Sequence, residues 1–451
     1  MNRLRLASFG LRGFVGESLP PASLIDYAAA FGTYSEKGPI LVGRDTRYSS
    51  PMLHAAVVAG LLGTGCKVFD LGICPTCMLQ FSTTQLKAQG AISISGGHNG
   101  MGWNALTLIG ADGGVLEPVG GESVLDCFHA RNFSMASSQH PIEIVEASAF
   151  APHYFSRLAE HVNVDAIRSR KFRVLIDPVG GAGCAYLETF AKTLGLQLVP
   201  INATESGYLA REPEPRPRSA LQMASIISHT GGDAGFVLSS DLGRVSIVTE
   251  TGEPASEEYT FSLIASHRLA KWTGPIVTNV CTTRMIDDLA KHHQVPLVKT
   301  RVGQAFIMSA VNDMQAALGG EGSGSVVLPA FSPAFDGFMM MALILESMAE
   351  QKVCLSELIR SLPRYHIIKR SIPCDSHDAY RAIEALKELS VFAEDGQIDL
   401  TDGVRVDWPD SWIHVRNSRT QQLLRVIAEG ADGEEVEQRA EHAIRVVQQA
   451  L

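Results

Sequence analysis

One pattern constrains the fold of this chain more than any other: an apolar strand, a Gly-rich or polar turn and an amphipathic helix follow one another three times. The expected strands are residues 39–43, 67–71 and 91–95 in the first copy, 172–177 and 197–201 in the second, and 276–279 and 296–298 in the third. Strands that alternate with helices are typical of βαβ units and mostly parallel sheets. The sequence therefore predicts an α/β architecture repeated at the scale of domains.

The last stretch of the chain has a different order of elements. After about residue 370 we expect a helix at 379–389, short strands at 404–408, 412–415 and 423–428, and a closing helix at 433–449. This order predicts a small α+β domain. Linkers are expected near 140–149, 250–256 and 369–376. They divide the 451 residues into four domains, 1–145, 146–253, 254–370 and 371–451, in keeping with usual domain sizes.

Charge and hydropathy exclude two classes of partner. A formal net charge of −10 disfavours nucleic acid, because phosphate backbones are bound by surplus Lys and Arg. The densest apolar run, residues 338–345, is far shorter than the roughly 20 residues that span a bilayer, and the first residues lack the apolar core of a signal peptide. We therefore expect a cytoplasmic protein without a membrane partner, as a monomer or a homodimer.

Eight cysteines are scattered along the chain, and only Cys74 and Cys77 have a spacing used by metal sites. No second CxxC and no suitably spaced histidine accompany them, so we expect small residues in a turn after a strand.

Four polar, Gly-rich segments stand out, about one in each domain. They are 93–100, which includes Gly97 and His98; 239–244, with Asp241 and Arg244; 319–325, with Glu321 and Ser323; and 416–420, with Arg416, Asn417, Ser418 and Thr420, followed by Arg425. Gly-rich turns expose backbone N–H groups that can hold an anion. Carboxylates and hydroxyls suit sugar hydroxyls, and clustered guanidinium groups form a phosphate clamp.

These segments, in this order, resemble the phosphohexomutase superfamily, which includes phosphoglucomutases, phosphomannomutases and phosphoglucosamine mutases. Its opening loop is matched by Phe9-Gly10-Leu11-Arg12-Gly13 and its next landmark by Gly43-Arg44-Asp45-Thr46-Arg47. Further matches are Gly180-Gly181-Ala182-Gly183, Glu212-Pro213-Glu214-Pro215, Thr300-Arg301-Val302-Gly303 and Asp336-Gly337. The resemblance implies three similar mixed-sheet domains and a C-terminal α+β domain around a central cleft.

The resemblance also implies a reaction. Members of this superfamily move a phosphoryl group between C1 and C6 of a hexose through a phosphoserine, with Mg²⁺ held by three carboxylates. Aligning His98 and Asn99 with the family's loop places Gly97 at the phosphoserine and Thr107 at a family lysine. The family's three metal carboxylates fall on Ser239, Asp241 and Gly243, so Mg²⁺ is expected to bind weakly or not at all.

The sugar and phosphate segments keep the family's residue types. The resemblance implies substrate contacts from Thr300, Arg301, Glu321 and Ser323, and phosphate contacts from the 416–425 segment. Three functions stay open: another reaction on a phosphosugar, served by His98, Arg12 and Arg244; a binding or regulatory protein; and a mutase that uses another phosphoryl carrier, such as Ser95.

Overall fold

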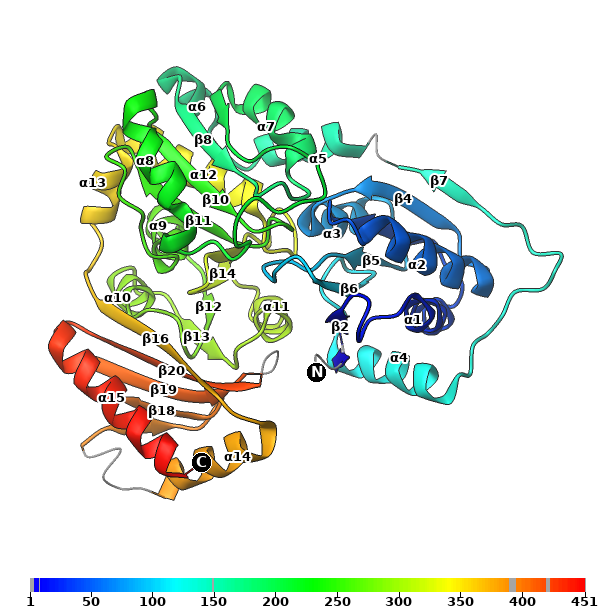
Figure 1. Ribbon diagram of the computed structural model, residues 1–451. Coiled ribbons are helices and arrows are strands. Elements are labelled where there is room, and N and C mark those ends of the chain that lie inside the picture. The colour runs from blue at the N-terminus through cyan, green and yellow to red at the C-terminus, as the bar shows by residue number, and fades with distance from the viewer. Residues whose placement is uncertain (1–3, 8, 148–149, 389–394, 419–421, 451) are drawn as a thin grey trace.

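The structure, a computed structural model, describes residues 4–7, 9–147, 150–388, 395–418 and 422–450. Figure 1 shows the first domain in blue and cyan on one side, the second and third in green and yellow on the other, and the last in orange and red below them. The N-terminal strands lie on the side of the first domain that faces the others (Figure 1). Segments from all four sequence regions thus meet near the middle of the molecule.

The first domain is built on a seven-stranded sheet in the order β1-β2-β6-β5-β3-β4-β7. Its elements are β1 (Arg5–Ala7), β2 (Gly10–Phe14), α1 (Pro21–Tyr34), β3 (Ile40–Arg44), α2 (Ser50–Thr64), β4 (Val68–Ile73), α3 (Thr76–Gln85), β5 (Gly90–Ile94), β6 (Trp103–Gly110), α4 (Pro118–Ala130) and β7 (Ile144–Glu146). Helices α1 and α2 pack on a core of this domain's own.

The second domain carries a four-stranded sheet in the order β11-β10-β8-β9. Its elements are α5 (Ala151–Ala159), α6 (Val164–Arg170), β8 (Arg173–Asp177), α7 (Leu187–Leu194), β9 (Gln197–Pro200), α8 (Leu221–Thr230), β10 (Ala234–Leu238) and β11 (Val245–Thr249).

The third domain has the sheet order β13-β12-β14-β15. Its elements are α9 (Glu258–Leu269), β12 (Ile276–Asn279), α10 (Met285–His292), β13 (Leu297–Thr300), α11 (Gln304–Asp313), β14 (Leu318–Glu321), β15 (Ser325–Val327), α12 (Gly337–Gln351) and α13 (Leu355–Arg360).

The predicted repetition is confirmed by strand topology. In each of these sheets a central strand pairs in parallel with two neighbours, and one of those pairs antiparallel with a fourth strand. The orders β4-β3-β5-β6, β9-β8-β10-β11 and β13-β12-β14-β15 are therefore equivalent. The first domain adds β2 and β1 beyond β6, and β7 beyond β4.

The C-terminal domain is an antiparallel sheet covered by two helices, as the α+β prediction required (Figure 1). Its strands are β16 (His366–Pro373), β17 (Gln397–Asp399), β18 (Val404–Asp407), β19 (Ser411–Asn417) and β20 (Leu423–Gly430), and its helices are α14 (Ser376–Glu388) and α15 (Gly433–Ala450). Its apolar core is separate from that of the other domains.

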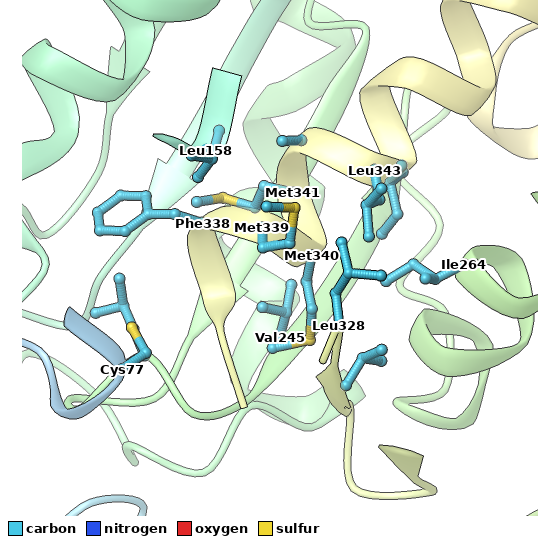
Figure 2. Packing of buried hydrophobic residues seen from close by; sticks show 14 of the residues in the cluster. Cys77, Leu158, Val245, Ile264, Leu328, Phe338, Met339, Met340, Met341 and Leu343 are labelled. Carbon is cyan, nitrogen blue, oxygen red and sulfur yellow. The ribbon is translucent and has the colours of Figure 1, made fainter. Parts of the chain in front are cut away.

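One apolar cluster joins the first three domains, and helix α12 runs through it. Figure 2 shows Phe338, Met339, Met340 and Met341 on this helix among side chains from several elements. All four are at most 2% exposed, as expected for a helix that is apolar on every side. The apolar run of residues 338–345 is thus a core helix, and no helix among the described residues is long and apolar enough to cross a bilayer.

Two of the expected linkers contain regular structure. The segment 369–376 includes most of β16, which pairs with β20 along its whole length, and the segment 140–149 contains β7, which pairs with β4. Both are edge strands with polar, exposed positions, and this pattern made them resemble linkers. Cys74 lies in the connection between β4 and α3 and Cys77 in the first turn of that helix, and both are buried in the shared core.

Helix α12 begins at a buried carboxylate whose protonation should affect stability. Asp336 accepts hydrogen bonds from Met339 N at 3.0 Å and from Tyr154 Oη at 2.7 Å, and burial raises the pKa of Asp336 to about 6. Because the folded protein then binds this proton more tightly than the unfolded chain, this carboxyl should lower stability as pH rises from about 4 to about 6.

Denaturant titrations at several pH values would measure this effect. The stability of the unchanged protein minus that of Asp336→Asn, which cannot titrate, should decrease across this window. A difference that stays constant with pH would contradict the assignment.

Candidate functional site

A cavity of about 470 Å³ lies where the four domains meet, and it is lined by residues from each of them. His98 comes from the first domain, Asp241 from the second, Glu321 from the third and Arg416 from the fourth. These belong to the four polar, Gly-rich segments of the sequence. The structure therefore brings the predicted segments to one site, in a volume usual for small-molecule pockets.

The loop after β5 is held in place by the buried side chain of Arg47. Its guanidinium contacts the Asp45 carboxylate and donates to the carbonyls of Gly97 at 3.1 Å and Asn99 at 2.5 Å. It also donates to Ser240 Oγ of the second domain at 2.9 Å, and this hydroxyl donates to Gly97 O at 2.7 Å. Arg47 is completely buried, so one charged group fixes two loops of the site to each other.

Gly97 faces the loop of residues 239–244, which contains Asp241. Its φ is +54°, and a Cβ added to it would lie 2.9 Å from Asp241 Oδ2. Asp241 Oδ1 accepts hydrogen bonds from Ser239 Oγ at 2.6 Å and from Gly243 N at 3.2 Å. The first and second loops therefore meet at this pair of residues.

Positive charge is concentrated around His98. Burial and the neighbouring Arg244, Arg12, Arg216 and Arg47 hold the pKa of His98 well below its ordinary value, so this ring is neutral at pH 7. Burial, and then repulsion from Arg244, lowers the pKa of Arg12 to about 10, which leaves the guanidinium charged. Arg244 and Arg216 share the Glu214 carboxylate, at 2.9 Å and 2.8 Å, so the cations around His98 outnumber the carboxylates paired with them, an environment that an anion would stabilise.

The third segment offers hydrogen-bonding groups of a different kind. Glu321 at the end of β14 accepts from Asn279 Nδ2 at 3.0 Å and from Ser323 Oγ at 2.6 Å. Ser325 Oγ donates to Gly243 O at 2.8 Å, which ties this turn to the Asp241 loop. The carboxylate is thus oriented by its neighbours and can accept hydrogen bonds from hydroxyls of a ligand.

The fourth segment places two arginines directly opposite each other. Arg416 on β19 pairs with Arg425 on β20 in the antiparallel register, so the side chains share one face of the sheet, where like charges are unfavourable. Arg416 lines the cavity, and its Nε is buried without a hydrogen-bond partner among the described residues. Arg425 donates to Ser371 Oγ at 2.7 Å, and burial lowers the pKa of Arg425.

The structure brings six of the expected site residues to the cavity: Arg12, His98, Asp241, Arg244, Glu321 and Arg416. Ser323 lies behind Glu321, and Asn417 accepts from Arg416 through its backbone carbonyl. Ser418 bonds Leu423 O through its backbone, whereas Thr420 lies outside the described residues. Thr300 donates to Arg301 O, and Arg301 donates to Thr401 O of the last domain at 3.0 Å. The neighbouring Val302 and Gly303 line the cavity.

Two residues that organise the site were not singled out from the sequence. Arg47 was visible only as part of the Gly43–Arg47 motif, and a charged motif directly after an apolar strand was the available signal. Lys369 donates to Glu257 Oε1 at 2.8 Å and to Gly322 O at 3.1 Å, so it supports the Glu321 turn from β16. A single lysine in an exposed strand gave no signal of this role.

Comparison with known proteins agrees with this arrangement in every domain. Four models of the phosphoglucomutase/phosphomannomutase family match in order: alpha/beta/alpha domain I at residues 5–135, domain II at 152–252, domain III at 256–365 and the C-terminal domain at 372–446. The chain belongs to the phosphoglucomutase/phosphomannomutase family.

Relatives and structures of the family are similar over nearly the whole chain. A phosphoglucomutase/phosphomannomutase of Thermococcus kodakarensis is 31% identical over 98% of both chains. A phosphoglucosamine/phosphogalactosamine mutase of Sulfurisphaera tokodaii is 29% identical over 94% of both. The crystal structure of a phosphoglucomutase/phosphomannomutase family protein of Burkholderia thailandensis superposes with a TM-score of 0.87 at 20% identity, over 99% of this chain and 98% of that one. The last likeness supports the fold.

Proposed function

We propose that this phosphohexomutase-family chain binds a hexose phosphate in its central cavity and does not transfer phosphoryl groups by the family's phosphoserine and Mg²⁺ chemistry. The observation that carries the proposal is the meeting of Gly97 and Asp241. Position 97 faces the Asp241 loop, as expected of the phosphoryl carrier, yet glycine has no oxygen to phosphorylate. The cavity therefore serves either another reaction on a hexose phosphate or binding alone.

The donor set around Asp241 does not fit Mg²⁺. The ion requires several hard oxygen ligands in octahedral geometry. Here one Asp241 oxygen already accepts two hydrogen bonds, Ser239 donates its hydroxyl to that oxygen, and Gly243 has no side chain to offer. We therefore derive no step through a metal ion.

The remaining groups are suited to holding a phosphosugar. Arg12, Arg244 and Arg416 can neutralise a phosphate, and charge-assisted hydrogen bonds of this kind are about twice as strong as neutral ones. Glu321 can accept from sugar hydroxyls. Neutral His98 can donate one hydrogen bond and accept another, and its lowered pKa makes it a weak base.

One observation favours a second candidate function, a mutase whose carrier is Ser95. Its Oγ lines the cavity, donates to Asp45 Oδ2 at 2.8 Å and accepts from Gly97 N at 3.0 Å. A hydroxyl beside a carboxylate can be activated as a nucleophile. However, the Asp45 carboxylate is already paired with Arg47 and also accepts a hydrogen bond from Ser50 Oγ, so it is not a free acceptor for the serine proton.

Phosphorus NMR with hexose 1- and 6-phosphates, Mg²⁺ and a hexose 1,6-bisphosphate primer separates these functions. The proposal expects ligand resonances to shift or broaden without conversion, and an intact mass without a phosphate adduct. Conversion of a 1-phosphate into a 6-phosphate would overturn it, and loss of that conversion in Ser95→Ala would identify the carrier.

Arg416→Ala should weaken hexose-phosphate binding at least tenfold. The substitution removes a charge-assisted contact, worth about 1.5–3 kcal/mol. Isothermal calorimetry measures the affinity, and Arg370→Ala, an exposed arginine of the same domain paired with Glu437, is the matched control. Equal affinities in both variants would show that Arg416, and with it the last domain, does not contribute to binding.

Removing divalent metal should leave this affinity nearly unchanged. The prediction follows from the poor donor set around Asp241, because the phosphate would be held by guanidinium groups. Calorimetry before and after treatment with a chelator tests it. A large loss of affinity that Mg²⁺ restores would show that Asp241 recruits further ligands.

A further inference from the structure

One end of the cavity is floored by the outer strands of the first domain. The register pairs Arg5 with Arg12 and Arg12 with Ala105, and it pairs Ala7 with Gly10 and Gly10 with Thr107. Residues directly opposite in antiparallel strands share a face, and the two rows are two positions apart, so all of them lie on the same side of the sheet. These six residues all line the cavity.

This floor is open because the helix on that side of the sheet covers only its middle. Helix α3 packs on β3 and β5, and Thr76 Oγ1 at its start lies 2.8 Å from Ser93 Oγ of β5. Strands β2 and β1 lie two and three places beyond β5 in the sheet order. Their face is met instead by the third domain, whose residues Val302 to Phe306 line the same cavity.

One end of this floor is charged and the other is not. Arg5 and Arg12 belong to one row of neighbouring residues across the strands, and Arg12 is one of the arginines around His98. Ala7, Gly10 and Thr107 form the next row. A Cβ on Gly10 would lie 2.0 Å from Leu106 O, so only glycine fits where β2 approaches β6. Without a side chain at this position, no atoms project from β2 into the cavity there. The second row therefore offers a shallow surface without charge.

Aromatic residues contribute to the same cavity. Phe9, Phe306 and Phe335 line the cavity from the first and third domains. Phe9 is 38% exposed although it is a large apolar residue, and burying a phenylalanine-sized surface is favourable by about 1.5–3 kcal/mol. Phe9 thus leaves apolar surface in solvent at the cavity, whereas Phe335 is only 7% exposed.

We infer that the cavity has a second subsite, formed by Ala7, Gly10, Thr107 and Phe9, that takes an uncharged aromatic substituent carried by the phosphosugar. The inference rests on the proposed binding of a hexose phosphate and specifies its class. The phosphate is held by Arg12 and Arg244, the hydroxyls reach Glu321, and the substituent lies on the small-residue floor against Phe9.

Calorimetry with glucose 6-phosphate and with 4-nitrophenyl glucoside 6-phosphate tests the subsite. The aryl compound should bind at least tenfold more tightly to the unchanged protein. In Phe9→Ala, and in Thr107→Phe, which fills the floor, the ratio of the two affinities should fall to less than threefold. Tyr380→Ala, an exposed aromatic residue of the last domain, is the control and should retain the full advantage.

The outcomes separate the two proposals. If neither compound binds, the proposed function fails. If both bind equally, or if the aryl compound binds more weakly, the cavity holds phosphosugars but the subsite does not exist. An advantage that survives in both Phe9→Ala and Thr107→Phe also overturns the subsite, because the substituent must then lie elsewhere.

Discussion

Replacing Arg47 with methionine should destabilise the protein by about 3–5 kcal/mol and abolish measurable phosphosugar binding. Removal of one partner of a buried ion pair leaves an uncompensated charge, and this costs about that amount. Here the charge is that of Asp45, which would keep only hydroxyl and backbone donors such as Ser50 Oγ at 2.5 Å and Ser95 Oγ at 2.8 Å.

The expected loss of binding has a separate cause. Arg47 holds the carbonyls of Gly97 and Asn99 and reaches Ser240 across the domain boundary. Without it the His98 loop loses the group that holds two of its carbonyls, and only the hydrogen bond from Ser240 Oγ to Gly97 O still joins it to Ser240 of the second domain.

Denaturant unfolding measures the stability change, and calorimetry with a hexose phosphate measures the binding. Arg131→Met is the matched control, because Arg131 is an exposed arginine whose ion pair with Asp26 lies on the surface, where such pairs contribute about 0–1 kcal/mol. A variant at position 47 that binds as tightly as the control would show that the loop keeps its shape without the guanidinium.

Glu429→Ala should destabilise the docking of the last domain by about 3–4 kcal/mol. This carboxylate on β20 is 1% exposed, and it accepts hydrogen bonds from Arg284 N at 2.8 Å and Trp412 Nε1 at 2.7 Å as well as from Thr283 Oγ1. Truncation leaves these donors buried without an acceptor, at about 1–3 kcal/mol each before partial relaxation.

Two of the three donors belong to the third domain, so this substitution acts on an interface as well as on a core. Scanning calorimetry should show the last domain unfolding at a lower temperature, and hexose-phosphate affinity should fall because Arg416 is carried by that domain. Glu437→Ala, at a partly exposed residue of helix α15 paired with Arg370, should change neither. Coincident transitions for the two variants would refute the role of Glu429.

Much of the fold could be predicted from the sequence because its signals are local. Strand β12 was expected at its observed bounds, and helix α15 was expected within one residue at each end. Periodicity and turn residues carry this information. Strands β7 and β16 were interpreted as linkers because an edge strand with exposed polar side chains lacks the apolar pattern of a buried one.

The segments that form the site could be predicted from the sequence, but the contacts between them could not. The four polar segments were visible, but the contact from Arg47 to Ser240 joins residues 193 positions apart, and no local pattern contains it. For the same reason the sequence did not show that Gly97 faces Asp241, or that Arg301 bonds the backbone of the last domain. Such facts depend on how domains pack.

The division of the apolar cores has a mechanical consequence. The first three domains share one continuous cluster, so a change in their relative orientation would have to break close packing, whereas the last domain keeps a core of its own. Its attachment to the rest consists largely of polar contacts such as those of Glu429 and Arg301, and these can be exchanged one by one. The first three domains can therefore behave as one rigid body, against which the last domain can rotate. Arg416 is the residue through which a bound ligand would act on the position of the last domain.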